Sequence, residues 1–504
     1  MSRMPCNTGN CAAYMRMPCI SGGRRVFLSD PDAILRKEDV DMRMNREREA
    51  YLLDDNSLGL PLLVLLYRAL MVLLLAGDLC LFGAMPVKLD TVELPAVLLA
   101  YAVLLVFLQG VYRACDVGHA RVSELVASQS MADLLSMGVL YLGVALYAHQ
   151  LFNPVRTVLV LVLQILVGCG WTLLANHLYF RNRKPPCTAV IYRKEDELKK
   201  LLSTPYFRMK YDVCRLIRDP ENDIQAISRE IEGCDVVFIT GVDAALANGM
   251  AKLCLDMDIR GYFVPHIGHI ILAGAQYMST FSVPILKVQR TRQYSVYRLL
   301  KRLFDFVAAL AGSIVTLPIM LLTALVIWLE DRGPVFYRQV RLTKNGREFK
   351  ILKFRSMSVN AEKDGVARLA RENDSRITKV GRFIRACRID ELPQLFNILA
   401  GDMSLVGPRP ERPEIAAQYQ QELPEFALRM QVKAGLTGLA QVYGRYNTEP
   451  YNKLQMDLMY INEMSFLKDL QLILITLKIL FIKESAQGIT DEAVMSDTKN
   501  DMTA

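Results

Sequence analysis

The feature that most constrains this chain is a series of apolar stretches in its first 180 residues. There are four of them, over residues 58–83, 94–112, 124–148 and 155–179. An α-helix needs about 20 apolar residues to cross a bilayer, and the second and fourth stretches meet that length clearly. The first and third carry the charged residues Arg68, Asp78 and Asp133, so buried core helices remain an alternative for them. We expect a bundle of four transmembrane helices over residues 58–180.

The arginines and lysines around these stretches predict an orientation. Residues 1–57 are rich in arginine, and Arg181, Arg183 and Lys184 follow the fourth stretch, whereas the loop at residues 149–154 has no Lys or Arg. Loops with an excess of Lys and Arg lie on the cytoplasmic side of a membrane. We therefore expect a flexible cytoplasmic extension at residues 1–57, and a cytoplasmic location for everything after residue 180. Residues 485–504 are polar and predict a disordered tail.

Residues 187–285 predict a small cytosolic α/β domain after the boundary at Pro185-Pro186. The expected strands are Thr188–Tyr192, Asp235–Thr240 and Gly261–Val264, and the expected helices are Ile224–Glu232 and Ala244–Met257. A Rossmann domain would carry G-x-G-x-x-G after its first strand, but Arg193-Lys194-Glu195 stands there. We expect a degenerate Rossmann-like domain without a nucleotide site and with a regulatory or assembly role.

Histidine and cysteine argue against several kinds of site. His266 and His269 could form half of a metal site, but no third ligand lies near them in the sequence, so we expect a structural loop there. The 11 cysteines contain no C-x-x-C pair, which argues against a zinc ribbon or a thioredoxin-type site. Scattered cysteines favour a reducing compartment. No histidine follows residue 269, so chemistry in the later part of the chain must proceed without imidazole.

A fifth apolar run, Phe306–Leu329, contains Pro318. A proline inside a helix removes one hydrogen bond and kinks or breaks it. Basic residues flank the run at Lys301-Arg302 and at Arg332, so neither end is favoured outside the cell. We expect a re-entrant membrane helix over residues 303–329 that turns at Pro318, with a kinked spanning helix as the alternative. The last apolar stretch, Leu470–Ile482, is too short to cross and suits an interfacial helix.

A dense cluster of charges lies in the segment GRFIRACRIDELPQLFN at residues 381–397. Its arginines recur every third residue, which places them on one side of a helix, and Asp390-Glu391 follows them. Alone, such a pattern is typical of a salt-bridged surface. Three neighbouring segments favour a site instead: KILKFRSM at 350–357, GDMSLVGPRPERP at 401–413 and GLTGLAQVYGRYN at 435–447. The last two present Arg409 and Arg445 on turns made of glycine and proline. One guanidinium group can donate two parallel hydrogen bonds to the oxygens of a phosphate.

These residue types point to phosphoryl transfer. Carboxylates can hold Mg²⁺ together with substrate phosphates, and a carboxylate can also act as the nucleophile. The net charge of +8 could in principle favour nucleic acid, but the basic residues are interleaved with carboxylates beside membrane segments, so we expect no nucleic-acid partner. The residues alone therefore indicate Mg²⁺-assisted phosphoryl transfer at a membrane surface.

Residues 298–484 resemble the bacterial sugar transferase family, the monotopic phosphoglycosyl transferases. Seven blocks carry the resemblance in the right order: KRLFDF, the helix with Pro318, GPVFYRQVR, KFRSM, RIDELPQLFN, GDMSLVGPRP and GLTGLAQVYGR. With the four preceding apolar stretches and the α/β region, the chain is similar in outline to the larger polyprenyl-phosphate hexose-1-phosphate transferases. The resemblance implies an α/β catalytic domain over residues 295–484.

The resemblance also implies a reaction. A UDP-sugar would donate sugar-1-phosphate to undecaprenyl phosphate and release UMP, as the first step of exopolysaccharide, capsule or O-antigen assembly at the bacterial inner membrane. Asp390 would attack the β-phosphorus and Glu391 would help to hold Mg²⁺. The residues that would bind phosphate or nucleotide are Arg385, Arg409 and Arg445, with Lys353 and Asp457 as weaker candidates. A homodimer is a further expectation.

One residue departs from the pattern of this family. Many relatives have Ser-Pro at the helix break, whereas this chain has Leu317-Pro318, which removes a hydroxyl partner for the freed backbone. The alternative to an enzyme is a membrane scaffold that has lost catalysis. The intact Asp390-Glu391 pair and the three arginines argue against that alternative.

Overall fold

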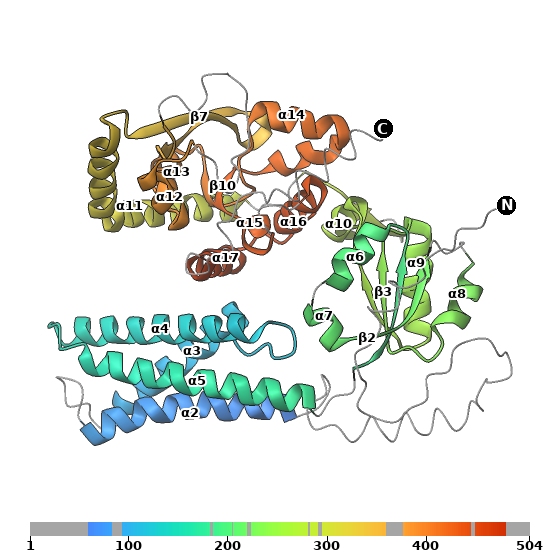
Figure 1. Ribbon diagram of the computed structural model, residues 1–504, viewed down its shortest axis with the longest axis horizontal. Helices are drawn as coiled ribbons and strands as arrows, with labels where there is room; N and C mark the ends of the chain where they lie inside the picture. The colour runs from blue at the N-terminus through green and yellow to red at the C-terminus, as the bar shows by residue number, and fades with distance from the viewer. Residues whose placement is uncertain are drawn as a thin grey trace, which may run out of the picture.

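The computed structural model describes residues 59–82, 93–181, 185–203, 205–218, 223–280, 283–290, 295–358, 376–444 and 449–479. The predicted N-terminal extension and C-terminal tail lie outside these ranges. Figure 1 shows a group of long helices, an α/β domain and a second mixed domain that carries the long helix α11 (Ser295–Asp331).

Four long apolar helices come first, as the sequence predicts. They are α2 (Gly59–Phe82), α3 (Glu93–Tyr112), α4 (Val122–Tyr147) and α5 (Val155–Arg181). With the later helix α11, five helices are long and apolar enough to span a membrane. The four helices share one core in which Tyr67 of α2 stacks on Trp171 of α5. Many of their other leucines and valines are exposed, which is the pattern expected of helices that face lipid.

The α/β domain is built on a parallel sheet in the order β2-β1-β3-β4. The strands are β1 (Cys187–Tyr192), β2 (Asp212–Arg218), β3 (Val236–Thr240) and β4 (Arg260–Phe263). Its helices are α6 (Glu195–Ser203), α7 (Pro205–Lys210), α8 (Ile224–Ile231), α9 (Ala244–Asp256) and α10 (Ile267–Ala273). Alternate residues of β1 enter different cores, because Ala189 and Ile191 pack with α8 and α9 while Val190 packs with α6. The predicted strands and helices are confirmed, whereas β2, α6, α7 and α10 were not predicted. The loop expected at His266 and His269 is wrong, because helix α10 starts directly after His266 and contains His269. Its apolar residues Ile267 and Ile270 pack in a core, which favours the helix.

A hairpin of β5 (Gln276–Thr280) and β6 (Val283–Lys287) leads from the α/β domain to α11 (Ser295–Asp331). Figure 1 shows α11 as two stretches that meet at a bend, and Pro318 lies inside the helix. Ala309, in the first stretch, packs with Leu395 and Ile398, while Met320 and Ile327, in the second, pack with Ile384. Both stretches therefore lie against the same domain, which a straight helix of about 55 Å could not do.

The second mixed domain begins after α11 with an antiparallel pair, β7 (Phe336–Leu342) and β8 (Glu348–Phe354). Its short parallel pair is β9 (Ser404–Val406) and β10 (Gly435–Thr437). The helical elements are η1 (Lys344–Gly346), α12 (Lys379–Ala386), η2 (Ile389–Glu391), α13 (Gln394–Ala400), α14 (Pro413–Glu422), η3 (Pro424–Gln431), α15 (Leu439–Tyr443), α16 (Pro450–Asn462) and α17 (Phe466–Ile479).

Among the described residues, this domain packs on both of the other parts of the molecule. Helix α17 lies on the membrane helices, where Tyr112 Oη of α3 donates to the Leu474 carbonyl oxygen at 3.0 Å. Helix α10 of the α/β domain packs on α16, and Ile267 and Ile270 share a core with Leu454 and Leu458. The second mixed domain therefore contacts both of the other parts.

Candidate active site

The two predicted carboxylates lie on a sharp turn between two helices. Thr378 caps the start of α12 by accepting a hydrogen bond from the Gly381 backbone N–H. Helix α12 ends at Ala386, and Arg388 then adopts a left-handed backbone with φ of 52°. A side chain at positive φ is strained and is held there by its surroundings. The strained residue starts the single turn η2, which carries Asp390 and Glu391.

Glu391 is held in a clamp of basic side chains. Its Oε1 accepts from Lys353 Nζ at 2.9 Å and from Arg409 Nη2 at 3.1 Å. Arg388 Nη1 lies 3.9 Å from Oε2. Burial by itself would raise the pKa of Glu391, but Lys353 and Arg409 outweigh it and hold the pKa well below its ordinary value. Glu391 is therefore a permanent anion at neutral pH.

Asp390 has the opposite electrostatic environment. Burial first, and then the adjacent charge of Glu391, raise the pKa of Asp390 to about 6, against the opposing charges of Lys353, Arg385 and Arg409. No donor in the described ranges makes a hydrogen bond to its carboxylate. Two neighbouring carboxyls whose pKa values diverge are typical of sites where the two play different chemical roles. Asp390 is the one with free lone pairs, and Glu391 is the one held in place.

The turn that presents Arg409 is built by close contact between two backbones. A Cβ at Gly435 would lie 2.1 Å from the Gly407 nitrogen, and a Cβ at Gly438 would lie 2.2 Å from the Gly407 oxygen. Only glycine allows that approach. The glycines of the two motifs thus bring these motifs together. Arg409 Nη1 also donates to Gln441 Oε1 of α15 at 3.1 Å, which ties the two motifs a second time.

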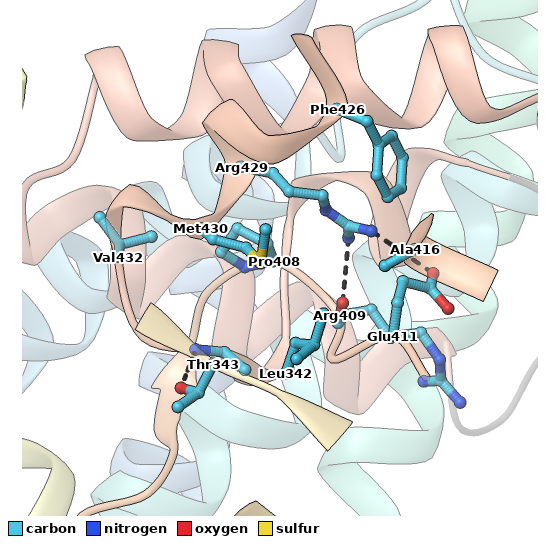
Figure 2. A pocket seen from close by; sticks show the side chains of 11 residues that line it. Leu342, Thr343, Pro408, Arg409, Glu411, Ala416, Phe426, Arg429, Met430 and Val432 are labelled. Atoms are coloured by element: carbon cyan, nitrogen blue, oxygen red, sulfur yellow. Dashed lines mark hydrogen bonds and ion pairs between the residues drawn. The ribbon is translucent and has the colours of Figure 1, made fainter. Parts of the chain in front are cut away.

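A buried guanidinium supports this turn from behind. Arg429 Nη2 donates to the Arg409 carbonyl oxygen at 3.0 Å, and Nη1 lies 3.4 Å from Glu411 Oε1. Figure 2 shows Arg429 between these two groups at the edge of a small pocket. Asp457 Oδ2, from α16, lies 2.8 Å from Nη2 of the same guanidinium, and both side chains are at most 4% exposed. A charge buried this deeply needs such partners.

The predicted residues fall into three sets. Lys353, Arg409 and Glu391 are brought into direct contact, and Asp390 and Arg385 lie close enough for their charges to interact. Asp457 instead pairs with Arg429, behind the PRP turn. Arg445 lies outside the described residues. Sequence reasoning missed Arg429, which lies in no motif, and Gln441, which lies in the block at residues 435–447 but was given no role there. Only the fold brings both side chains to Arg409.

The donor set is compatible with Mg²⁺. This ion usually takes one or two carboxylates together with phosphate oxygens of a substrate. Asp390 and Glu391 are adjacent, and within the described ranges the nearest partner of Glu391 Oε2 is Arg388 at 3.9 Å. In the described part of the chain, no group of three or more His, Cys, Asp or Glu side chains is arranged to hold a metal by itself. The dyad therefore fits an ion that arrives with a phosphorylated substrate.

The His266 pair does not form a metal centre among the described residues. His266 Nε2 contacts the Val242 carbonyl oxygen, and its Nδ1 lies 3.5 Å from Tyr451 Oη. Both ring nitrogens thus have protein partners at the contact between α10 and α16.

Comparison with known proteins places the second mixed domain in a family. Residues 296–483 match the profile described as bacterial sugar transferase. A UDP-glucose:undecaprenyl-phosphate glucose-1-phosphate transferase of Escherichia coli K12 is 40% identical over 340 residues, which are 64% of this chain and 72% of that protein. A Caulobacter vibrioides protein of the same name is 44% identical over 191 residues, 37% of this chain and 71% of the relative.

A third relative carries a different sugar in its name. It is a UDP-N-acetylgalactosamine-undecaprenyl-phosphate N-acetylgalactosaminephosphotransferase of Aeromonas hydrophila, 42% identical over 186 residues. The match covers 36% of this chain and 44% of that relative, so this chain spans less than half the length of that protein. The matched profile contains Lys353, the Asp390-Glu391 pair and Arg409. The chain therefore belongs to the bacterial sugar transferase family.

Proposed function

We propose that this chain transfers sugar-1-phosphate from a UDP-sugar to undecaprenyl phosphate, forming a polyprenyl-diphosphate sugar and releasing UMP. The observation that carries the proposal is the asymmetric dyad, in which Glu391 is clamped by Lys353 and Arg409 while the adjacent Asp390 carboxylate is left without a hydrogen-bond donor among the described residues. The names of the relatives supply the donor and acceptor classes. The product would start exopolysaccharide, capsule or O-antigen assembly.

The chemistry follows from these charges. An Asp390 oxygen attacks the β-phosphorus of the UDP-sugar, and the bond from this phosphorus to the bridging oxygen breaks, so that UMP leaves. The sugar phosphate is then held as an acyl phosphate on Asp390. A phosphate oxygen of undecaprenyl phosphate attacks the same phosphorus and releases the Asp390 carboxylate. Arg409, Arg385 and Lys353 bind and orient phosphate oxygens and offset their negative charge during both transfers.

Asp390 and Glu391 are the residues that would hold Mg²⁺ at this site. When bound, the ion supplies charge neutralisation at the phosphate oxygens. Glu391 suits that role because its low pKa keeps it anionic and its ion pairs fix its position.

The placement of the chain in the membrane is part of the proposal. Helices α2 to α5 cross the inner membrane as a bundle, and α11 enters one leaflet, bends at Pro318 and returns to the cytoplasmic side. The support is that both stretches of α11 pack on the domain that carries the dyad, and that basic residues flank both ends. Labelling of single cysteines near residues 300 and 335 from the same side supports re-entry, and labelling from opposite sides contradicts it.

The test of the reaction is UMP release. Purified protein is mixed with undecaprenyl phosphate, Mg²⁺ and a panel of UDP-hexoses and UDP-N-acetylhexosamines, with EDTA as a control. We expect UMP from one donor and its loss with EDTA. No UMP from any donor would favour a membrane scaffold that has lost catalysis.

A second measurement tests the covalent step. Without undecaprenyl phosphate, the enzyme should release a burst of UMP no larger than one equivalent, because Asp390 then stays occupied. Asp390→Asn should abolish the burst. Asp402→Asn is the matched control, since Asp402 pairs with exposed Arg347 on the same domain, and it should keep the burst. A burst of normal size from Asp390→Asn would remove Asp390 from the nucleophile role.

A further inference from the structure

Three thiols of the α/β domain lie together where its central strands begin. Cys187 is the first residue of β1, Cys214 lies on β2 next to it, and Cys234 lies just before β3. The sulfur atoms of Cys187 and Cys234 are 3.7 Å apart, and the Cys187 thiol donates toward the Cys234 sulfur. These residues are far from the dyad in the sequence and have no part in the proposed transfer.

The backbone already holds the two chain segments in register. The Asp235 N–H donates to the Cys187 carbonyl oxygen at 2.9 Å, and the Cys187 N–H donates to Asp235 Oδ2 at 3.0 Å. A disulfide needs its sulfur atoms to approach to about 2 Å. Gly233, which precedes Cys234, has a φ of 82°, so the segment before Cys234 has a glycine that can absorb the shift.

The pKa values of the two thiols are shifted in opposite directions, so that one thiol is the better nucleophile. The hydrogen bond from Cys187 and the nearby charge of Arg215 lower the pKa of Cys234 below its ordinary value, against the opposing effect of burial. The hydrogen bond to Cys234 and then burial raise the pKa of Cys187. A thiolate stabilised by a cation is the nucleophilic form of cysteine. Cys234 is 6% exposed, which favours a small oxidant over a bulky one.

We propose that Cys187 and Cys234 form a reversible disulfide when the protein meets hydrogen peroxide. The Cys234 thiolate attacks one peroxide oxygen, the O–O bond breaks, and the leaving hydroxide takes up a proton to become water. Cys187 sulfur then attacks the sulfenic sulfur of Cys234, the S–O bond breaks, and the Cys187 proton leaves with the hydroxide as a second water. Two thiols are oxidised and one peroxide is reduced by two electrons.

Whether the disulfide between Cys187 and Cys234 forms depends on the redox conditions around the protein. In a reducing cytosol the pair rests as two thiols, because glutathione and thioredoxin systems keep such groups reduced. The bond forms under oxidative stress and ties the start of β1 to the segment before β3. The modification site is independent of the sugar transfer, so the two proposals can fail separately.

The experiment treats the full-length protein in detergent with hydrogen peroxide, blocks the remaining thiols and maps the peptides by mass spectrometry without reduction. We expect a peptide pair joined through Cys187 and Cys234, lighter by two hydrogen atoms, that disappears after dithiothreitol. Cys187→Ala and Cys234→Ser should each remove this linked pair. Cys254→Ser, which changes a buried cysteine of the same domain, should leave it intact.

Two outcomes overturn the proposal. One is a Cys234 oxidised only to sulfinic acid while Cys187 stays free, which would mean that the resolving step does not occur. The other is a bond between Cys187 and Cys214, since this would assign the reactive pair to β1 and β2. Each variant is first checked for the thermal unfolding midpoint of the untreated protein, and a variant that keeps it is folded. The two independent variants, at Cys187 and at Cys234, keep the test decisive if one of them unfolds.

Discussion

The ionisation of Asp390 sets the expected pH dependence of the reaction. Its pKa is raised to about 6, and only the carboxylate can attack phosphorus. The rate should therefore rise with pH through a midpoint of about 6 and level off at higher pH. The measurement is the single-turnover rate of UMP release without acceptor, for the wild type and for Asp402→Asn as a control. A flat profile between about pH 5 and 8 would show that no group with this pKa limits the step.

Substitution of Lys353 tests what sets the pKa of Asp390. Its ammonium lies 2.9 Å from Glu391 and lowers the pKa of Asp390. Lys353→Met should therefore move the midpoint of the pH profile upward and lower the plateau rate by about 10²- to 10³-fold, as for the loss of one charge-stabilising group. Lys353→Arg keeps the charge and should restore the midpoint. An unchanged midpoint in Lys353→Met would mean that Lys353 does not act on Asp390.

Arg429 and Asp457 are expected to act on stability and on the position of Arg409. Arg429→Met leaves Asp457 and Glu411 without their cation in a buried site, and breaking a buried ion pair costs about 3–5 kcal/mol. The thermal unfolding midpoint should drop clearly. Arg347→Met, in an exposed pair with Asp402, should cost at most about 1 kcal/mol. If Asp457→Asn raised KM for the UDP-sugar and left the midpoint unchanged, Asp457 would be a substrate ligand, as the sequence suggested.

At the scale of elements, the bend of α11 is the feature to test. Pro318 removes a backbone hydrogen bond, and the hydroxyls of Ser313 and Thr316 donate to carbonyls four residues earlier, which also favours bending. Pro318→Ala should straighten the helix and pull Met320 and Ile327 away from α12. UMP release should fall at least about tenfold, equivalent to about 1.4 kcal/mol in the barrier.

The matched control for the bend is Val315→Ala, an exposed position on the same helix, which should keep the activity. Cysteine labelling near residues 300 and 335 gives the structural readout. Full activity of Pro318→Ala together with same-side labelling would mean that packing against the domain is enough to hold the bend, without the proline.

The elements that the sequence predicts well are those whose pattern is local. Apolar length predicts α2 to α5, and Pro318 predicts a bend in α11, which is one continuous helix. Strand β2 was missed because its sequence, DVCRLIR, mixes charged and apolar residues, and only Ile217 in it is buried. A strand that leaves most of its side chains exposed carries a weak periodic signal.

The same reasoning explains what could be predicted of the site. Asp390, Glu391, Lys353 and Arg409 lie in motifs, and the fold brings them together. The pairing of Asp457 with Arg429 depends on where α16 and η3 meet, which no spacing in the sequence encodes. The glycines of the two turns predict that the backbone is tightly folded there. Which backbone atoms each glycine contacts could not be predicted, because the pairing of β9 with β10 determines it.

At the scale of the whole molecule, the α/β domain contacts the second mixed domain, which carries Asp390 and Glu391, and this contact can help to hold the active site in position. Helix α10 meets α16 through Ile267 and Ile270, and Asn462 Nδ2 donates to the Ile270 carbonyl oxygen at 2.6 Å. Helix α16 also carries Asp457, which holds Arg429 and through it the carbonyl of Arg409. A chain of direct contacts thus runs from the α/β domain to the turn that clamps Glu391.

This chain of contacts predicts an effect on catalysis from a mutation in the α/β domain. Ile270→Asp places a carboxylate in an apolar contact where Ile270 is 5% exposed, which costs several kcal/mol (about 3 or more) unless the contact opens. We expect a lower thermal unfolding midpoint and slower UMP release, with the pH midpoint unchanged because the dyad's charges stay in place. Leu272→Asp is the matched control, since Leu272 is 49% exposed on the same helix, and it should behave as the wild type. Normal activity and stability of Ile270→Asp would mean that α16 holds its position without α10, and that the α/β domain contributes nothing to the geometry of the clamp.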